Sequence, residues 1–189
     1  YKSLRSGTVS IASSEIALHC ALLPALKSFR RAYPGVHVRI SNTSTPQAVE
    51  MLKKGMVDIA VVTEPYEPSA GMTSKILRSI QETPVCSGAF AMLTGTALAA
   101  KQLADYPMIG LTENTGSFRF YSDYFNKVGI PYSPEIQVAT VDQILPVVRS
   151  DLGIGFVPSD YLVKESMENL VILNIKPPIP PRNIYIVKR

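Results

Sequence analysis

The stretch LLPALKSFRRAYPGVHVRI, residues 22–40, joins two hydrophobic patterns across a Tyr-Pro-Gly turn. Between Leu22 and Tyr33, apolar side chains recur at the spacing of one face of an α-helix. The residue before a proline leaves the helical region and a glycine accommodates the turn that follows, so the helix should end here. From Val36 to Ile40, apolar and polar residues alternate, as is typical of a half-buried β-strand. The stretch therefore predicts a helix that leads directly into a strand.

The flanking segments continue this alternation of strands and helices. A strand is expected at residues 8–13, followed by a helix over residues 15–33 that Pro24 should kink or restart. A helix over residues 46–54 and an apolar strand over residues 57–62 come next. Strands that alternate with helices in this way predict an α/β fold with a parallel sheet.

The second half of the chain repeats the pattern. Its strands are expected at residues 108–111, 136–139 and 153–157, and its helices at residues 118–128 and 140–149. Two further strands, near residues 170–175 and 183–187, have no partner unit of their own, so we expect them to return to the first lobe. The prediction is two α/β lobes, one made of residues 1–84 and 159–189 and the other of residues 85–158.

Composition and charge favour a folded chain that does not bind nucleic acid by itself. Apolar residues make up 46% of the sequence, and the net charge of +4 is dispersed rather than gathered in the stripe that phosphates require. The uncharged segment 83–100 reaches the length of a membrane span, but Pro84, Gly88 and Gly95 interrupt it. We therefore interpret it as a crossover strand and a turn, and expect no membrane contact.

No motif for catalysis, metal binding or a cofactor stands out. Cys20 and Cys86 form no CxxC pair, and His19 and His37 lack a second ligand at metal spacing. The chain contains no GxSxG elbow, Walker A loop or HExxH helix. We expect no metal, no cofactor and no enzymatic activity, and the two unpaired thiols favour a reducing cytoplasm.

Hydroxyl-bearing residues follow most of the predicted strands. In parallel sheets, ligands bind at the carboxyl ends of strands, where helix N-termini present free N–H groups. The candidate ligand-binding residues are Ser13, Ser14, Ser44, Thr45, Thr63, Thr115, Gly116, Ser117 and Thr140. Hydroxyls and N–H groups suit a small polar or anionic ligand. Serine and threonine are also the usual N-caps, so capping alone explains each residue equally well when it is taken singly.

Two charged residues near these positions leave their roles open. Glu64 could repel an anionic ligand or bind an amine, and Arg119 could pair with a carboxylate or face solvent.

The stretch of residues 22–40 resembles the effector-binding domain of LysR-type transcriptional regulators. The segments LKKGMVDIAVV, LADYPMIGLTENTGS and VATVDQILPVVRSDLGIGFVPSDYL extend the resemblance, in the family's order, over almost the whole chain. The resemblance implies a two-lobed, type II periplasmic-binding-protein-like fold, in which each lobe is a mostly parallel sheet flanked by helices. It also implies a small-molecule cleft between the lobes, with effector contacts at Ser13, Ser14, Thr45 and residues 115–117.

The resemblance implies partners as well as a ligand. Family members form a homodimer or homotetramer, in which the first helix of one copy packs against the second lobe of another. They bind DNA through an N-terminal winged helix-turn-helix, which this sequence does not contain. Because the sequence opens at Tyr1 rather than Met, we expect a fragment of a longer protein. Peroxide-sensing members carry a reactive cysteine in the turn that corresponds to residues 114–117, and this chain has none there.

The expected function is effector sensing and oligomerisation within a cytoplasmic bacterial LysR-type regulator, where the effector shifts the population of lobe arrangements. One alternative is the solute-binding protein of a transporter, and a less favoured one is an enzyme on the same scaffold. The chain opens with no signal-peptide pattern, and its two unpaired cysteines suit an extracytoplasmic protein poorly.

Overall fold

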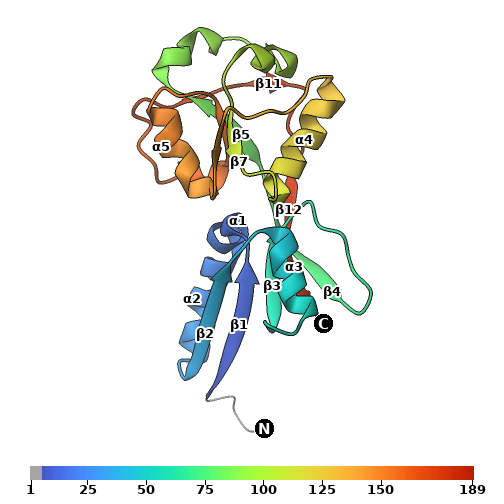
Figure 1. Cartoon of the computed structure of the whole chain (residues 1–189). Helices are drawn as coiled ribbons and strands as arrows, with labels where there is room; N and C mark the ends of the chain where they lie inside the picture. Colours follow the sequence, from blue (N-terminus) through green and yellow to red (C-terminus); the bar gives the residue numbers. More distant parts are fainter. Residues whose placement is uncertain (1–5) are drawn as a thin grey trace. The chain divides into compact units, whose positions relative to one another are not determined.

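The computed structural model describes residues 6–189, which form two compact units. Among the described residues, unit 1 comprises residues 6–79 together with Asn183–Arg189, and unit 2 comprises Ile80–Arg182. The chain therefore passes between the units twice. Figure 1 shows both units in the colours of the sequence.

Unit 1 contains a five-stranded sheet with the strand order β2-β1-β3-β12-β4. The strands are β1 (Gly7–Ser13), β2 (Val36–Asn42), β3 (Ile59–Thr63), β4 (Thr73–Ile80) and β12 (Arg182–Lys188). β1 pairs in parallel with β2 and β3, so that Ile11 lies between Ile40 and Ile59. β12 runs antiparallel beside β3. The predicted parallel sheet and the predicted return of the last strand are both confirmed.

The long helix expected in unit 1 is built from three pieces. They are α1 (Glu15–Ala17), a π-helical segment (Leu18–Leu22) and α2 (Leu23–Ala32). Pro24 lies in the first turn of α2, so the helix restarts at the proline, directly after the π-helical segment. The second helix, α3 (Thr45–Lys53), packs on the sheet through Ala48 and Leu52, which are fully buried.

Unit 2 is built on three small sheets with the strand orders β10-β5-β9, β11-β6 and β7-β8. The strands are β5 (Glu82–Cys86), β6 (Leu98–Ala99), β7 (Ile109–Leu111), β8 (Ile136–Val138), β9 (Gly155–Pro158), β10 (Val171–Ile172) and β11 (Ile175–Lys176). The helices are α4 (Gly116–Val128) and α5 (Ile144–Arg149), and short 3-10 turns cover Gly88–Leu93, Ala100–Asp105, Val141–Gln143 and Ser159–Leu162. Aromatic rings fill the core, where Tyr121 and Phe125 pack against Phe156.

The structure corrects the boundary between the two lobes. Residues 80–84 and 159–182, which the sequence placed in the first lobe, belong to unit 2. The reason is strand pairing: β10 pairs with β5, and β11 pairs with β6. Only β12 returns to the sheet of unit 1. Unit 2 contains both kinds of sheet, because β5 pairs antiparallel with β9 and β10, whereas β7 pairs in parallel with β8 and β6 with β11.

Among residues 6–189, no helix has the length and apolar character needed to cross a membrane.

Candidate functional site

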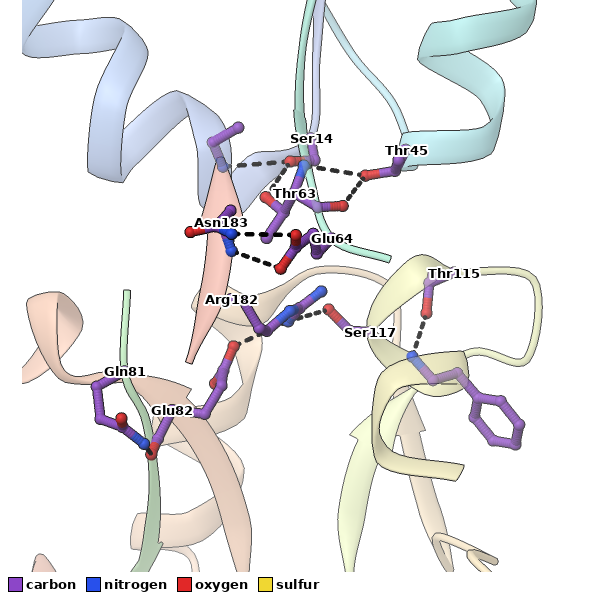
Figure 2. Close-up of polar contacts among 12 residues, drawn as sticks. Ser14, Thr45, Thr63, Glu64, Gln81, Glu82, Thr115, Ser117, Arg182 and Asn183 are labelled. Atoms are coloured by element: carbon purple, nitrogen blue, oxygen red, sulfur yellow. Dashed lines mark hydrogen bonds and ion pairs between the residues drawn. The ribbon is translucent and has the colours of Figure 1, made fainter. Parts of the chain in front are cut away.

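Three of the candidate hydroxyl groups meet at one edge of the sheet in unit 1. Ser14 follows β1, Thr63 ends β3, and Thr45 is the first residue of α3. Ser14 Oγ lies 2.9 Å from Thr63 Oγ1. Thr45 Oγ1 donates to the carbonyl of Thr63 at 2.9 Å and accepts from its N–H at 3.2 Å. Because β1 and β3 are parallel, their carboxyl ends bring these residues together, as Figure 2 shows.

The hydrogen-bonding capacity of this cluster is only partly used. Ser14 Oγ also accepts from the backbone N–H of Ala17 at 3.2 Å, which makes Ser14 the N-cap of α1. Ser14 and Thr63 each carry one hydroxyl hydrogen, and the hydrogen bond between them uses only one of the two. When Ser14 donates, the hydrogen of Thr63, at the end of β3, stays available for an acceptor atom of a ligand. The cluster is therefore suited to an acceptor such as a carboxylate or phosphate oxygen.

Two other candidates in unit 1 have local roles. Ser13 is fully buried, and its hydroxyl donates to the carbonyl of Ser14 at 2.9 Å. Ser44 is the N-cap of α3 and forms a reciprocal capping box with Gln47, at 3.4 and 3.3 Å. Ser13 thus lies apart from the hydroxyl cluster, and Ser44 fits the capping alternative.

Glu64, next to this cluster, is held by the first residues of β12. Its carboxylate accepts from the N–H of Asn183 at 2.8 Å, from Asn183 Nδ2 at 3.2 Å and from the hydroxyl of Tyr185 at 2.9 Å. The hydrogen bond to Glu64 raises the pKa of Tyr185, because it stabilises the neutral phenol. The charge of Glu64 is thus held in place by donors of the protein itself.

The candidates in unit 2 gather at the start of α4. Thr115 is the N-cap: its hydroxyl accepts from the N–H of Phe118 at 3.1 Å and donates to the carbonyl of Thr112 at 2.8 Å. Gly116 and Ser117, in the first turn, are buried. Ser117 Oγ accepts from Arg182 Nη1 at 3.1 Å, so one candidate already has a cationic partner (Figure 2).

Arg182 is the centre of a buried polar group in unit 2. Its Nη1 lies 2.8 Å from Glu82 Oε1, and both side chains are 1% exposed. The guanidinium also lies over the ring of Phe120, 4.6 Å from its centroid. Burial, and next the charge of Glu82, raise the pKa values of Tyr121 and Tyr132, so both phenols stay neutral near the ion pair.

Thr140 follows β8 at the same edge as the start of α4, because β7 and β8 are parallel. Its hydroxyl donates to Asp142, and its N–H donates to Gln143 Oε1 at 3.2 Å. These are the contacts of a residue that opens a helical turn. Arg119 is exposed on α4.

The partners of the candidate residues lie too far away along the chain for a sequence pattern to identify them. Glu82 and Arg182 are separated by 100 positions, and Glu64 and Asn183 by 119. One feature of the sequence could have pointed to the ion pair. Glu82 is the first residue of β5 and Arg182 is the first residue of β12, so each strand begins with a charged residue.

Two α/β units, two crossings of the chain between them, and hydroxyls at strand ends define the class of two-lobed ligand-binding folds. The model of the LysR substrate binding domain matches residues 2–189, and the chain belongs to this family. It is 24% identical over 165 residues to a probable nitrogen assimilation transcriptional activator of Synechococcus elongatus, covering 86% of the chain and 53% of that protein. It is 23% identical to the transcriptional regulator CysB of Burkholderia cenocepacia, over 82% of the chain and 49% of that protein. The chain spans about half the length of these relatives.

Solved structures confirm the fold. The cofactor-binding domain of the Cbl transcriptional regulator superposes with a TM-score of 0.85 at 19% identity, covering 97% of this chain and 81% of that one. The regulatory domain of Synechocystis CcmR, in complex with 2-PG, gives 0.84 at 17% identity, with 97% and 88% covered. The effector-binding domain of QuiR, in complex with shikimate, gives 0.81 at 17%, with 97% and 87% covered. The fold is the two-lobed, type II periplasmic-binding-protein-like fold that the resemblance implied.

Proposed function

We propose that this chain is the effector-sensing and oligomerisation domain of a bacterial LysR-type transcriptional regulator that acts in the cytoplasm. Membership of the LysR substrate binding domain family and the similarity to transcriptional regulators support the proposal. The same relatives favour a regulator over a transport receptor or an enzyme, so the chain acts by binding rather than by catalysis. DNA would be bound by a segment outside this sequence, since the chain spans about half of its relatives' length.

The ligand is a small polar or anionic metabolite. The observation that carries this is the Ser14–Thr63 pair, which retains one hydroxyl hydrogen for an acceptor atom at the end of β3. Thr45 lies in the same cluster, at the N-terminus of α3, where the helix dipole favours negative charge. In unit 2, the start of α4 at Thr115–Ser117 offers the same chemistry, and Thr140 opens the neighbouring turn. A ligand that binds one conformation of the chain better than another shifts the population toward that conformation.

A thermal-shift titration tests the ligand class. The probes are inorganic phosphate, sulfate and shikimate, with glycerol as a neutral control. A bound anion at 100 times its Kd stabilises the folded chain by about 2.7 kcal/mol, which raises Tm. Thr63→Val removes the hydroxyl pair at nearly constant volume, and we expect it to weaken anion binding roughly tenfold, the effect of losing one hydrogen bond to a charged group.

The matched control is Thr73→Val, which changes an exposed threonine on β4. If the wild type, Thr63→Val and Thr73→Val bind the anion with equal affinity, the hydroxyl cluster is not part of the binding site.

We further propose that the exposed face of α2 binds a second copy of the chain in a homodimer or homotetramer. None of the ten residues of α2 is buried, and its apolar stripe includes Leu23 and the adjoining Tyr33, which are 43% and 44% exposed. Phe29 packs on Tyr33 with ring centroids 5.1 Å apart, which gives the stripe a preformed surface. An amphipathic helix with an uncovered apolar face is typical of an interface.

Sedimentation equilibrium tests the assembly. We expect the wild-type chain to associate, and Leu23→Asp to weaken association more than tenfold, because a charge would be buried without a partner. Ser28→Asp, which introduces the same charge at an exposed position that lies away from Leu23 around the same helix, is the control. A chain that stays monomeric at all concentrations would contradict this part of the proposal.

A further inference from the structure

Thr115 and Ser117, the two candidates with hydroxyls at the start of α4, use their hydroxyl hydrogens differently. The hydroxyl of Thr115 accepts from the N–H of Phe118 and donates to the carbonyl of Thr112, so its hydrogen is already bound within unit 2. The hydroxyl of Ser117 accepts from Arg182 Nη1 at 3.1 Å. A guanidinium has five donors and no acceptor, so Ser117 cannot donate in return, and its hydrogen points away from Arg182.

Arg182 is held firmly enough to fix this direction. Its Nη1 lies 2.8 Å from Glu82 Oε1, and the guanidinium lies over the ring of Phe120 on the other side of the pair. Figure 2 shows the guanidinium bonded both to the carboxylate of Glu82 and to the hydroxyl of Ser117. Arginine stays protonated wherever the chain is folded, and Ser117 is buried, so the donor is permanent and little water competes with it.

The hydroxyl pair in unit 1 has no such fixed direction. Either Ser14 or Thr63 can be the donor of the hydrogen bond that joins them, so either hydrogen can be the one that remains for a ligand. The hydroxyl of Ser117 has no such choice while Arg182 donates to it. Unit 2 therefore sets the stricter requirement for an acceptor atom.

We propose that the Glu82–Arg182 pair positions the hydroxyl of Ser117 as a hydrogen-bond donor, and that unit 2 thereby selects ligands that place an acceptor atom at this hydroxyl. Arg182 is a positioning residue, because it acts on the ligand through Ser117. The pair contains one positive and one negative charge, so it supplies direction rather than net charge. The inference rests on the proposed function, which gives Ser117 a place in the ligand site.

Calorimetric titration with inorganic sulfate, whose oxygens are all acceptors at neutral pH, tests the role of Ser117. We expect Ser117→Ala to weaken sulfate binding roughly tenfold, the effect of losing one hydrogen bond to a charged group. The matched control is Ser122→Ala, the same change at a partly buried position further along α4, which should leave the sulfate affinity unchanged. A Ser117→Ala chain that is less stable but binds sulfate as the wild type does would overturn the proposal.

The paired variant Glu82→Met with Arg182→Met tests the positioning. It removes one charge of each sign, so the net charge of the chain is unchanged, and it leaves no isolated charge buried. Ser117 keeps its hydroxyl but loses the donor that directs it. We expect sulfate binding to weaken roughly threefold, and Ser117→Ala to weaken it less than about threefold further in this background, because both changes act on one hydrogen bond.

Arg182→Lys adds a rescue that stability alone would not produce. Lysine also has donors and no acceptor, so it keeps the direction of the Ser117 hydroxyl and the charge beside Glu82. We expect this variant to bind sulfate nearly as tightly as the wild type, although it unfolds at lower urea concentration. A sulfate affinity that follows the stability of the variants, rather than the presence of a donor at position 182, would overturn the positioning role.

The same titrations separate this inference from the proposed function. If Thr63→Val weakens sulfate binding and Ser117→Ala does not, the ligand site in unit 1 stands and the role of Arg182 is overturned. If the wild-type chain binds neither sulfate nor phosphate, the proposed ligand class is overturned, and the inference falls with it.

Discussion

Arg182 and Glu82 form a fully buried ion pair, with Nη1 and Oε1 2.8 Å apart, although 100 positions separate them in the sequence. Glu82 starts β5, close to the point where the chain enters unit 2, and Arg182 is the last residue before the chain leaves it. The pair therefore joins the two ends of unit 2. Since Arg182 also donates to Ser117, it connects these ends to the first turn of α4.

Arg182→Met should strongly destabilise the chain. Removing one partner of a buried pair leaves the other charge without compensation, which costs about 3–5 kcal/mol. Urea unfolding at pH 7 measures the change in the free energy of unfolding. Replacing both partners, as in Glu82→Met with Arg182→Met, should recover much of the loss, because no isolated charge is then buried.

The control for this prediction is Lys54→Met. Lys54 pairs with Glu50 at 3.3 Å, but the two side chains are 63% and 54% exposed, so the pair contributes only about 0–1 kcal/mol. An Arg182→Met variant as stable as Lys54→Met would show that burial adds nothing to the pair between Glu82 and Arg182.

The strand and helix order of the fold could be predicted from periodicity, because α3 and α4 each bury one face and the apolar strands β3 and β9 are buried along most of their length. β4 escaped detection because it has no buried face: seven of its eight residues are exposed, including Ile76 and Leu77. β10 and β11 contain two residues each, too few for alternation to show which sheet they join. The lobe boundary was misplaced for this reason.

The candidate site was predictable only in part. The rule that ligands bind at the carboxyl ends of parallel strands located Ser14, Thr45 and Thr63, because it depends on chain order alone. The rule could not distinguish a residue that joins the hydroxyl cluster from one that only caps a helix. Ser44 is an example, because it is the N-cap of α3. The rule could not find Arg182 at all, since a contact across 100 positions leaves no spacing to recognise.

Ser44 allows capping and ligand binding to be separated. Ser44→Ala should lower the free energy of unfolding by about 1 kcal/mol, because α3 loses its N-cap. Ser44→Asp should retain stability, since aspartate caps a helix as well as serine does and its charge suits the helix N-terminus. The same charge would repel an anion bound near Thr45, so the thermal shift with phosphate or sulfate should shrink. Anion binding that is the same in Ser44→Asp and the wild type would place the ligand away from α3.

Tyr124 should make the chain sensitive to alkaline pH. Its hydroxyl donates to the carbonyl of Pro177 at 2.6 Å, and burial raises its pKa from 10.0 to about 12. A raised pKa in the folded state means that the folded chain holds this proton more tightly than the unfolded chain. The stability from this group is therefore fully present below pH 10 and is lost as pH rises from about 10 to about 12.

Tyr124→Phe removes this titration, together with the hydrogen bond to Pro177. The variant should be less stable than the wild type at pH 8, and the difference should narrow at pH 11, because the wild type loses part of its advantage there. Urea midpoints at the two pH values measure this, with Tyr33→Phe on the exposed helix end as the control.

Three other tyrosines, Tyr121, Tyr132 and Tyr185, also have raised pKa values, so they add to the loss of stability at alkaline pH in every variant. The informative quantity is therefore how the stability difference between the wild type and Tyr124→Phe changes from pH 8 to pH 11. A difference that stays constant from pH 8 to pH 11 would mean that the proton of Tyr124 is held no more tightly in the folded chain than in the unfolded one.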